Sequence, residues 1–372
     1  MSSSTAEVTI IGGGVIGCSI AYHLARRGIR SSVFEQNRFA SGASGATAGM
    51  ITPLWHVDHN NPALFALGMS SLKSFPELAA ELTEAGIDPE LRMCGVLKVA
   101  MDDEQAEALE RDLMWQAELG IDVRWANTQD VLKLEPEVNG ENHGGVFSPQ
   151  EGHIRGQRLV DSLVHAAGAM GATFSEGVEV ISLITEGSRV LGVRTNRGEV
   201  LAGHTVLAAG PWTGLFRRWI QQPALPVRPV KGQRLLVRKP GFLPKILIHS
   251  FMGTNVPQSD GSILIGATRH EGEFDQEITV DAVSTILSNA TTILPVLRDS
   301  ILVQATAGVR PGSPDDVPIM GPIPGWEGLS VASGHDAVGV MLSPETGRLM
   351  ADYIATGDAT ALKPFNLARF ES

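Results

Sequence analysis

An apolar run that ends in a glycine turn constrains the fold of this chain more than any other feature. Residues 8–11 are Val-Thr-Ile-Ile, and the residues after them predict a tight turn followed by a helix that stops at Gly28. The turn and the start of the helix contain Gly12, Gly14, Val15, Ile16 and Gly17, with the glycines in G-x-G-x-x-G spacing. In this motif the first glycine permits the bend, the second lets a pyrophosphate approach, and the third lets helix and strand pack closely. A pyrophosphate would meet the free N–H groups at the positive end of the helix.

A second predicted strand, residues 31–35, supports a dinucleotide site. It ends in Glu35, followed by Gln36, at the spacing expected for an acid that binds a ribose diol. A carboxylate there would repel a 2′-phosphate, which disfavours NADP, but the motif does not separate FAD from NAD. The alternative is a plain βαβ unit in which Glu35 is only exposed.

Small residues dominate the segment 41–50 that follows. It contains Ser41, Ser44, Thr47, Gly49 and Met50 among alanines and glycines. The segment lies beyond the second strand, at the carboxyl end of the predicted sheet, where ligands bind in open α/β sheets. Small side chains would let backbone amides and hydroxyls reach a large flat cofactor, whereas a surface linker is the alternative.

Composition narrows the class of protein. The chain has 372 residues, enough for two domains, and its net charge of -12 argues against a nucleic-acid surface. The two cysteines, Cys18 and Cys94, indicate no disulfide framework and no metal site. The N-terminus lacks the features of a signal peptide, and the apolar run 8–25 is interrupted by its glycines, so we expect no membrane span and a cytoplasmic protein.

The rest of the chain predicts an α/β fold in two parts. Helices are expected at 62–85, 102–119, 157–169, 279–293 and 344–356, with strands at 91–100, 172–174, 178–184, 189–195, 199–202, 204–212 and 329–335. Sheet-like alternation runs from 227 to 305. Two short strands and a strand closing on Ala-Gly, downstream of the fingerprint, suit a two-part FAD domain better than an NAD domain. We expect a nucleotide domain of residues 1–86, 148–218 and 306–372, and a substrate domain of residues 87–147 and 219–305.

Ordered motifs along the whole chain resemble the FAD-dependent D-amino-acid oxidase family, and most of all its glycine oxidase branch. They are the fingerprint 11–17, the small-residue loop 41–50, Val206 to Trp212, Val230 to Gln233, Leu264 to Thr268, Ala307 to Asp315, Pro318 to Pro322, and Ser333 to His335 with Leu342 to Pro344. The resemblance implies a glutathione-reductase-type FAD-binding Rossmann domain joined to an antiparallel-sheet substrate domain, with the flavin between them.

The resemblance also implies which residues bind FAD. Gly12, Gly14, Val15, Ile16 and Gly17 would meet the pyrophosphate, Glu35 and Gln36 the adenosine ribose, and Val178 the adenine end. Ser41, Ser44, Thr47, Gly49 and Met50 would line the flavin, Ala209, Gly210 and Trp212 would pass beside the dinucleotide, and Gly334, His335, Gly339, Val340 and Met341 would meet the isoalloxazine.

Arg310 matches the family arginine that holds the substrate carboxylate. A guanidinium binds a carboxylate through two parallel hydrogen bonds, which sets both the position and the rotation of an amino acid. The Cα–H can then face the flavin, which carries out the redox step while the protein orients the substrate. The alternative is an arginine that only binds backbone carbonyls. Met50 and His335 are the other catalytic candidates, although His335 could equally be a packing residue.

Two departures from the family put glycine or a simple D-amino acid in doubt. The strand at 253–257 has no tyrosine, and residues 336–338 after Gly-His are Asp-Ala-Val instead of an aromatic residue, arginine and asparagine. Thr254 and Arg269 are the candidates for substrate binding in their place, and His249 and His270 are the alternatives.

The sequence therefore leaves three functions open. The first is an oxidase that transfers a hydride from the Cα of a small or N-substituted amino acid to FAD and reduces O₂ to H₂O₂. The second is the FAD subunit of a heteromeric opine, hydroxyproline or cyanide-synthase-type dehydrogenase that passes electrons to a partner subunit. The third is a flavin-binding protein without turnover. We expect an oligomer of undetermined size.

Overall fold

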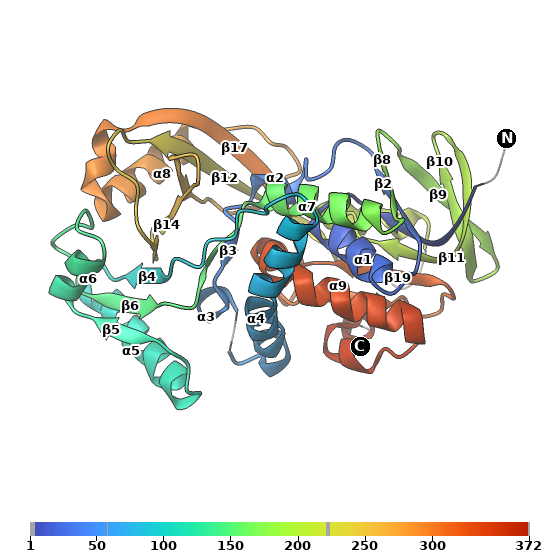
Figure 1. The fold of residues 1–372 in the computed structure, drawn as a ribbon, viewed down its shortest axis with the longest axis horizontal. Coiled ribbons are helices and arrows are strands. Elements are labelled where there is room, and N and C mark those ends of the chain that lie inside the picture. Colours follow the sequence, from blue (N-terminus) through green and yellow to red (C-terminus); the bar gives the residue numbers. More distant parts are fainter. Residues whose placement is uncertain (1–3, 58, 221–223, 371–372) are drawn as a thin grey trace.

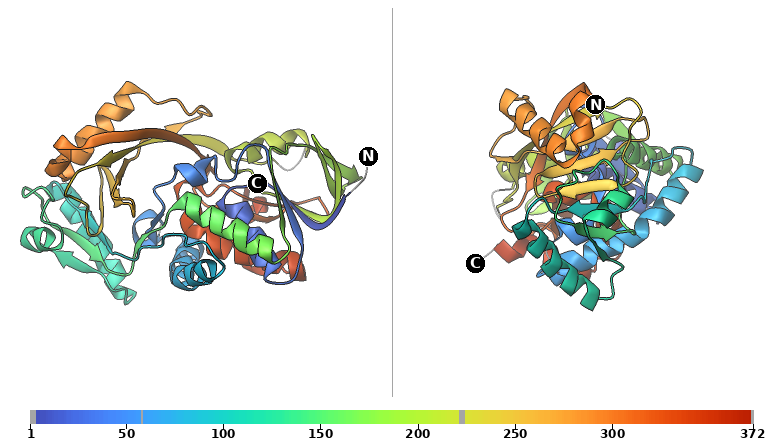
Figure 2. Two further views of the ribbon diagram at one scale, coloured as in Figure 1. Left: turned by 45° about the horizontal axis from the view of Figure 1, so that its top comes forward. Right: turned by 90° about the vertical axis from the view of Figure 1, so that its left-hand side faces the viewer.

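The computed structural model describes residues 4–57, 59–220 and 224–370. Two large β-sheets form the two ends of an elongated molecule, and a band of helices lies between and below them (Figure 1). Both marked chain ends lie on the half that contains the first sheet. Figure 2 shows that the second sheet stands apart from the helices around α1, so that the two halves meet along one central strip.

The first sheet is mostly parallel. Its order is β18-β19-β11-β1-β2-β8, and β10 and β9 continue from β11. Its strands are β1 (Ser4–Ile11), β2 (Ser31–Glu35), β8 (Thr173–Glu176), β9 (Val180–Glu186), β10 (Arg189–Thr195), β11 (Gly198–Leu207), β18 (Ile319–Pro322) and β19 (Leu329–Ser333). The pairs β10–β11, β9–β10 and β18–β19 are antiparallel, and the other pairs are parallel.

Helices cover one face of the first sheet. They are α1 (Val15–Ala25), α4 (Pro62–Glu84), α7 (Gly156–Ala169) and α9 (Gly339–Thr356), and their apolar residues form one core with β1 and β2. A second core on the opposite face contains residues of β9 and β10 and of the 3-10 helix η1 (Gly210–Arg218). This arrangement of helices, parallel sheet and antiparallel strands is the expected α/β FAD-binding fold.

Helix α9 begins five residues before the predicted start at Pro344. Proline has no N–H to donate to the carbonyl of the residue four positions earlier, which here is Val340. The hydroxyl of Ser343 donates to that carbonyl at 2.8 Å, so the acceptor is satisfied and the helix continues through the proline. The Ser343 carbonyl accepts from the Ser19 hydroxyl of α1 at 2.7 Å, which joins the two helices.

The second sheet has nine strands in the order β16-β12-β15-β14-β13-β4-β6-β5, with β17 paired to β12. Its strands are β4 (Val96–Val99), β5 (Arg124–Ala126), β6 (Gly145–Ser148), β12 (Arg228–Arg238), β13 (Leu247–Ser250), β14 (Gly253–Pro257), β15 (Ile263–Gly266), β16 (His270–Glu271) and β17 (Ile301–Gly312). The expected antiparallel sheet is present except that β4 and β13 run parallel. Strand β4 belongs to the earlier segment 87–147, so it joins β13 without a hairpin that would force the antiparallel direction.

The remaining elements complete the two halves. They are α2 (Ala43–Ala46), α3 (Pro53–His56), α5 (Asp103–Glu118), α6 (Thr128–Leu134), α8 (Val280–Ile293), the pair β3 (Met50–Ile51) and β7 (Gly152–His153), and the 3-10 helices η2 (Pro295–Asp299), η3 (Asp336–Val338), η4 (Thr360–Phe365) and η5 (Leu367–Phe370). Asp102 accepts from the Gln105 amide at 2.8 Å and caps α5, and aspartate is a type of residue that favours this position.

One further predicted element differs from the structure, and one predicted boundary meets a continuous strand. The strand expected at 204–212 ends at Leu207, since Gly210 has a φ of +53° and starts η1, which carries Pro211 in its first turn. The expected domain boundary between residues 305 and 306 falls inside β17, which pairs with β12 along its whole length. The division into domains remains a prediction, and this pairing would place its last boundary after Gly312.

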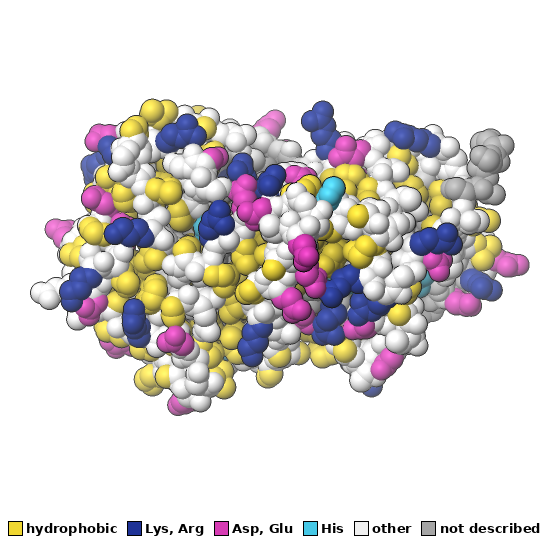
Figure 3. Space-filling view, viewed as in Figure 1, with side chains coloured by type: hydrophobic (Ala, Val, Ile, Leu, Met, Phe, Trp, Pro, Cys, Tyr) yellow, Lys and Arg dark blue, Asp and Glu magenta, His cyan; other side chains and the backbone are white. Residues whose placement is uncertain are grey.

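None of the helices in the described part of the chain is long and apolar enough to cross a membrane. On the face shown in Figure 3, basic and acidic side chains are interspersed and do not gather by sign.

Candidate functional site

One cavity of about 730 Å³ extends from the glycine turn after β1 to the second sheet. Its walls come from the carboxyl ends of β1, β2 and β11, from the loop 41–50, and from β12 to β15 and β17. The parallel strands bring the fingerprint, the second-strand acid and the last loop to the same edge of the first sheet, where ligands bind in such folds.

Glu35 closes one end of the cavity. One carboxylate oxygen accepts from the Gly13 amide at 2.9 Å, and the other accepts from the Asn37 amide at 2.8 Å. The Val178 amide donates to the Glu35 carbonyl at 2.9 Å, so the residue predicted for the adenine end lies beside the acid. These contacts hold the carboxylate rigidly at the position expected of a ribose acceptor.

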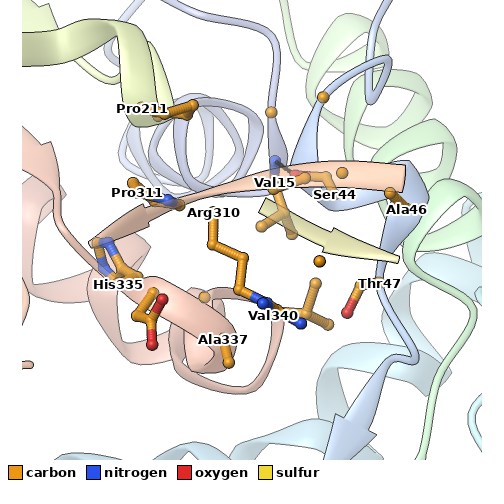
Figure 4. Close-up of a pocket in the computed structure, with 18 of the residues that line it drawn as sticks. Val15, Ser44, Ala46, Thr47, Pro211, Arg310, Pro311, His335, Ala337 and Val340 are labelled. Carbon is orange, nitrogen blue, oxygen red and sulfur yellow. Dashed lines mark hydrogen bonds between the residues drawn. The ribbon is translucent and has the colours of Figure 1, made fainter. Parts of the chain in front are cut away.

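The glycine turn brings backbone close to the cavity. A Cβ at Gly12 would lie 2.4 Å from the Ala208 carbonyl oxygen, and its φ is +116°, so only glycine fits there. Gly14 caps α1 without any capping side chain. The hydroxyl of Ser44, from the small-residue loop, accepts from the Val15 amide at 2.9 Å (Figure 4). The first turn of α1 contains no acidic residue, so its N-terminus could accept a pyrophosphate.

Arg310 projects from β17 into the cavity (Figure 4). Its guanidinium lies directly over Gly232 of β12, where a Cβ would come within 2.4 to 2.6 Å of three guanidinium atoms. One guanidinium nitrogen donates to the Thr268 carbonyl at 3.3 Å. Burial lowers the pKa of Arg310, while the nearby Asp336 opposes this shift. Arginine remains charged at neutral pH, so the cavity contains a cation with donors left for a ligand.

His335 is fully buried and lines the same cavity as Arg310. Its Nε2 and the Thr346 hydroxyl are hydrogen-bonded at 3.1 Å, and its Nδ1 has no partner in the described structure. Burial lowers the pKa of His335 to about 3, so the ring is neutral at physiological pH. A neutral imidazole here can orient a ligand but does not supply a charge.

Arg269 lies at the wall of the cavity but is engaged by acids. It donates to Asp336 at 2.5 Å and also faces Glu271 and Asp316. Its predicted role in substrate binding remains a prediction, and it would require Arg269 to exchange one of these partners for a substrate carboxylate.

The end of the cavity away from Glu35 is polar. The Thr52 hydroxyl bonds His56 Nδ1 at 2.7 Å, the Thr254 hydroxyl bonds His249 Nδ1 at 2.8 Å, and the two imidazole centroids are 5.1 Å apart. Burial lowers the pKa of His56 to about 4 and that of His249 well below its usual value. Thr254 and His249, two of the candidates for substrate contacts, therefore lie together. His270 is exposed and lies outside the cavity.

Most of the predicted site residues line this one cavity. They are Gly12, Gly14, Val15, Ile16, Glu35, Gln36, Ser41, Ser44, Thr47, Met50, Val178, Ala209, Gly210, Trp212, Thr254, Arg269, Arg310, His335, Gly339, Val340 and Met341. Their individual roles remain predictions.

Three predicted contacts, Gly17, Gly49 and Gly334, do not line the cavity. A Cβ at Gly17 would lie 2.1 Å from the Gly12 carbonyl oxygen, and one at Gly49 would lie 1.7 Å from the Ile154 carbonyl oxygen. Gly334 has a φ of +74°. These glycines shape the backbone next to the cavity and are not exposed to a ligand in it.

Sequence reasoning missed several lining residues, of which Lys98 and Asp336 are the most informative. Lys98 lies within the entirely buried strand Val96–Val99, and a charged residue in an apolar strand was the available signal. In the sequence, Asp336 stood out only as a departure from the family pattern. Its φ of +41° is uncommon for a residue other than glycine, so its backbone conformation could not be predicted.

The fold and the cavity together define a dinucleotide-binding protein. The cavity has an acid for a ribose, a helix N-terminus for a pyrophosphate, a wall of small residues, and a guanidinium at the far end. The sequence pattern of the FAD dependent oxidoreductase (DAO) family matches residues 7–353. Glycine oxidase of Geobacillus kaustophilus is 34% identical over 367 residues, which cover 98% of this chain and 97% of that protein. Its crystal structure superposes with a TM-score of 0.94 at 33% identity and covers 99% of both chains.

Hydrogen cyanide synthase subunit HcnC of Pseudomonas aeruginosa is also similar, at 30% identity over 411 residues, covering 99% of this chain and 97% of that protein. The chain belongs to the FAD dependent oxidoreductase family. It is an FAD-dependent amino-acid or amine oxidoreductase, which confirms the family prediction and sets aside a flavin-binding protein without turnover.

Proposed function

We propose that this enzyme oxidises the C–N bond of a small amino acid or N-substituted amino acid held by Arg310. The observation that carries the proposal is the partly buried guanidinium over Gly232, with donors available to a ligand in the cavity. A carboxylate is the ligand whose charge and planar shape match these donors. Relatives named glycine oxidase support an amino-acid substrate.

When bound, FAD supplies a two-electron acceptor whose N5 takes the hydride from the substrate Cα. Arg310 fixes the α-carboxylate and so limits the rotation of the Cα–H bond. Because His335 is neutral and the two buried histidines near Thr254 are neutral as well, these rings do not protonate the substrate amine. The substrate amine must therefore enter the cavity uncharged or lose its proton there. Its lone pair then forms the C=N bond as the hydride leaves.

The complete reaction balances with water and dioxygen. The amino acid loses a hydride and a proton to give an imino acid, and water converts this into a keto acid and an amine. O₂ takes the two electrons and two protons to give H₂O₂. Glycine would give glyoxylate and ammonia.

A heteromeric dehydrogenase is the second candidate, because a relative of similar identity is a subunit of hydrogen cyanide synthase. In that case a partner subunit accepts the electrons in place of O₂. The absent tyrosine at 253–257 and the Asp-Ala-Val at 336–338 favour a substrate other than glycine in either case.

The test separates these candidates. The purified holoenzyme is mixed without oxygen with glycine, sarcosine, D-alanine, D-proline, hydroxyproline and opines, and bleaching of the flavin absorbance identifies the donor. Air is then readmitted while H₂O₂ is measured. Rapid return of colour with one equivalent of H₂O₂ supports the oxidase, and slow return supports the dehydrogenase. If none of these compounds bleaches the flavin, the proposed substrate class is wrong.

A further inference from the structure

Lys98 is a buried cation in the wall of the cavity that the redox chemistry does not use. Its side chain is 8% exposed, and it forms no hydrogen bond or ion pair with any residue that the structure describes. Its ammonium lies 4.7 Å from the Trp55 ring centroid and 4.8 Å from that of Phe251. Ring faces attract a cation, but they accept none of its three N–H groups in an ordinary hydrogen bond. A buried ammonium with free donors is costly unless a ligand satisfies it.

The sheet register places Lys98 on the same face as the rest of the substrate end. Lys98 lies opposite His249, His249 opposite Thr254, Thr254 opposite Gly266, and Gly266 opposite Arg234. Directly opposed residues on neighbouring strands project to the same face. One row of side chains therefore crosses five strands of the sheet, with Lys98 at its outer end.

Arg310 belongs to the same face near the other end of this row. Arg310 lies opposite Val230 of β12. Every second residue of a strand projects to the same face, so Val230, Gly232 and Arg234 share one face, and Arg310 shares it with them. Its guanidinium reaches Thr268, just beyond the end of β15. From β15 to β4 there are three strand spacings, or about 14 Å. The four-carbon stem of Lys98 spans part of that distance, which leaves room for a ligand chain of several atoms between the two cations.

Among the described residues, no acid forms an ion pair with Lys98. The buried acid Glu151 also acts on Lys98; it accepts from the Leu54 amide at 3.0 Å, and burial raises the pKa of Glu151 to about 8. Glu151 is therefore mostly protonated at neutral pH. The charge of Asp112 raises the pKa of Lys98 more than that of Glu151 does, although Asp112 forms no ion pair with it in the described part of the chain, and the neighbouring rings of His56 and His249 are neutral. Burial lowers the pKa of Lys98, which a bound anion would reverse.

We propose that Lys98 binds a second carboxylate of the substrate, so that the enzyme prefers an amino acid with two acid groups over its neutral counterpart. Arg310 binds the α-carboxylate, and the substituent that carries the second carboxylate extends across the small side chain of Thr254 towards Lys98. This inference rests on the proposed function. The second carboxylate belongs either to the side chain or to the substituent on nitrogen.

The experiment compares substrates that differ only in a distal carboxylate. On the nitrogen arm, N-(2-carboxyethyl)glycine and N-(3-carboxypropyl)glycine are compared with N-propylglycine and N-butylglycine. On the side-chain arm, D-glutamate and D-2-aminoadipate are compared with D-norvaline and D-norleucine. The rate of anaerobic flavin bleaching gives kcat/KM for each compound. A charge-assisted hydrogen bond should favour the dicarboxylate by about 10-fold to 100-fold on one arm.

The Lys98→Met variant preserves side-chain length and removes the charge, and we expect it to reduce the dicarboxylate preference to about 3-fold or less. Lys133→Met is the matched control, since Lys133 is exposed on α6 and pairs with Asp130. A second readout is the affinity for glutarate relative to butyrate, measured by calorimetry, which should show the same preference in the wild type and lose it in Lys98→Met.

The outcomes separate this inference from the proposed function. Oxidation of neutral substrates without a dicarboxylate preference overturns the role of Lys98 but not the amino-acid oxidation. A preference that survives in Lys98→Met also overturns it. If no compound bleaches the flavin, the proposed function fails, and the glutarate comparison still decides whether Lys98 binds a carboxylate. If Lys98→Met does not fold, the absence of any preference in the wild type is sufficient to reject the inference.

Discussion

Replacing Gly232 with alanine should damage substrate binding without touching any residue expected to contact the substrate. Gly232 lies inside β12 and is not among the residues with positive φ, so alanine can adopt its backbone conformation. Its added Cβ would lie 2.4 to 2.6 Å from three atoms of the Arg310 guanidinium. The end of a flexible side chain can move away, so the protein should fold while the guanidinium is displaced.

The size of the displacement follows from the contact distance. Carbon atoms pack at about 3.5 Å or more, so the guanidinium must move by about 1 Å. A 1 Å misplacement of an orienting group can cost about 100-fold in rate. For Gly232→Ala we therefore expect kcat/KM to fall by about 100-fold, or about 2.7 kcal/mol. Arg310→Leu, which removes both carboxylate hydrogen bonds, should cost about 1,000-fold or more.

The assay is anaerobic flavin bleaching with the best donor, together with thermal unfolding and flavin content. Gly203→Ala is the control, because Gly203 lies in strand β11 and its Cβ would have an ordinary contact of 3.4 Å. Both variants should contain flavin and unfold within a few degrees of the wild type. If Gly232→Ala has the wild-type kcat/KM, the guanidinium does not anchor the substrate, and the proposed role of Arg310 must be abandoned.

Three further predictions concern the cofactor and stability. Glu35→Gln replaces a charged acceptor of the ribose diol, so the dissociation constant of FAD should rise about 10-fold in a fluorescence titration, and unchanged affinity would argue against this contact. Gly17→Ala places a Cβ 2.1 Å from a backbone carbonyl oxygen that cannot move aside, so we expect little folded protein, and a wild-type thermal midpoint would contradict the close packing of α1 on β1. Burial lowers the pKa of His23 and His153 to about 4, so the unfolded chain binds more protons than the folded chain between about pH 4 and 6.5, and stability falls as the pH falls through that window. His153→Gln should therefore reduce the loss of unfolding free energy between pH 7.5 and 5 by roughly 2 kcal/mol in urea titrations, whereas equal losses in both proteins would refute the assignment.

Local sequence was sufficient for the nucleotide half of the cavity. The strand, turn and helix at 8–25 form one continuous segment, and the spacing to Glu35 is set by one helix and one strand. Both arrangements follow from hydrogen bonds and packing between neighbours in sequence, which is why the fingerprint predicts them. The helix caps, such as Asp102, were predictable for the same reason.

The resemblance named Arg310 and Thr254, but only tertiary structure decided how the substrate half is arranged around them. Arg310, Gly232 and Lys98 come from three distant segments, and their positions depend on which strands pair and in what register. No local pattern shows that Gly232 lies beneath a guanidinium or that a lysine in an apolar strand faces a cavity. The sequence by itself determined a dinucleotide site, because that site rests on a short-range pattern. FAD and the family followed from the order of motifs along the whole chain. The shape and charge of the substrate end arise from long-range strand pairing. This pairing places Lys98 and Arg310 in the same sheet, although about 200 residues separate them in the sequence.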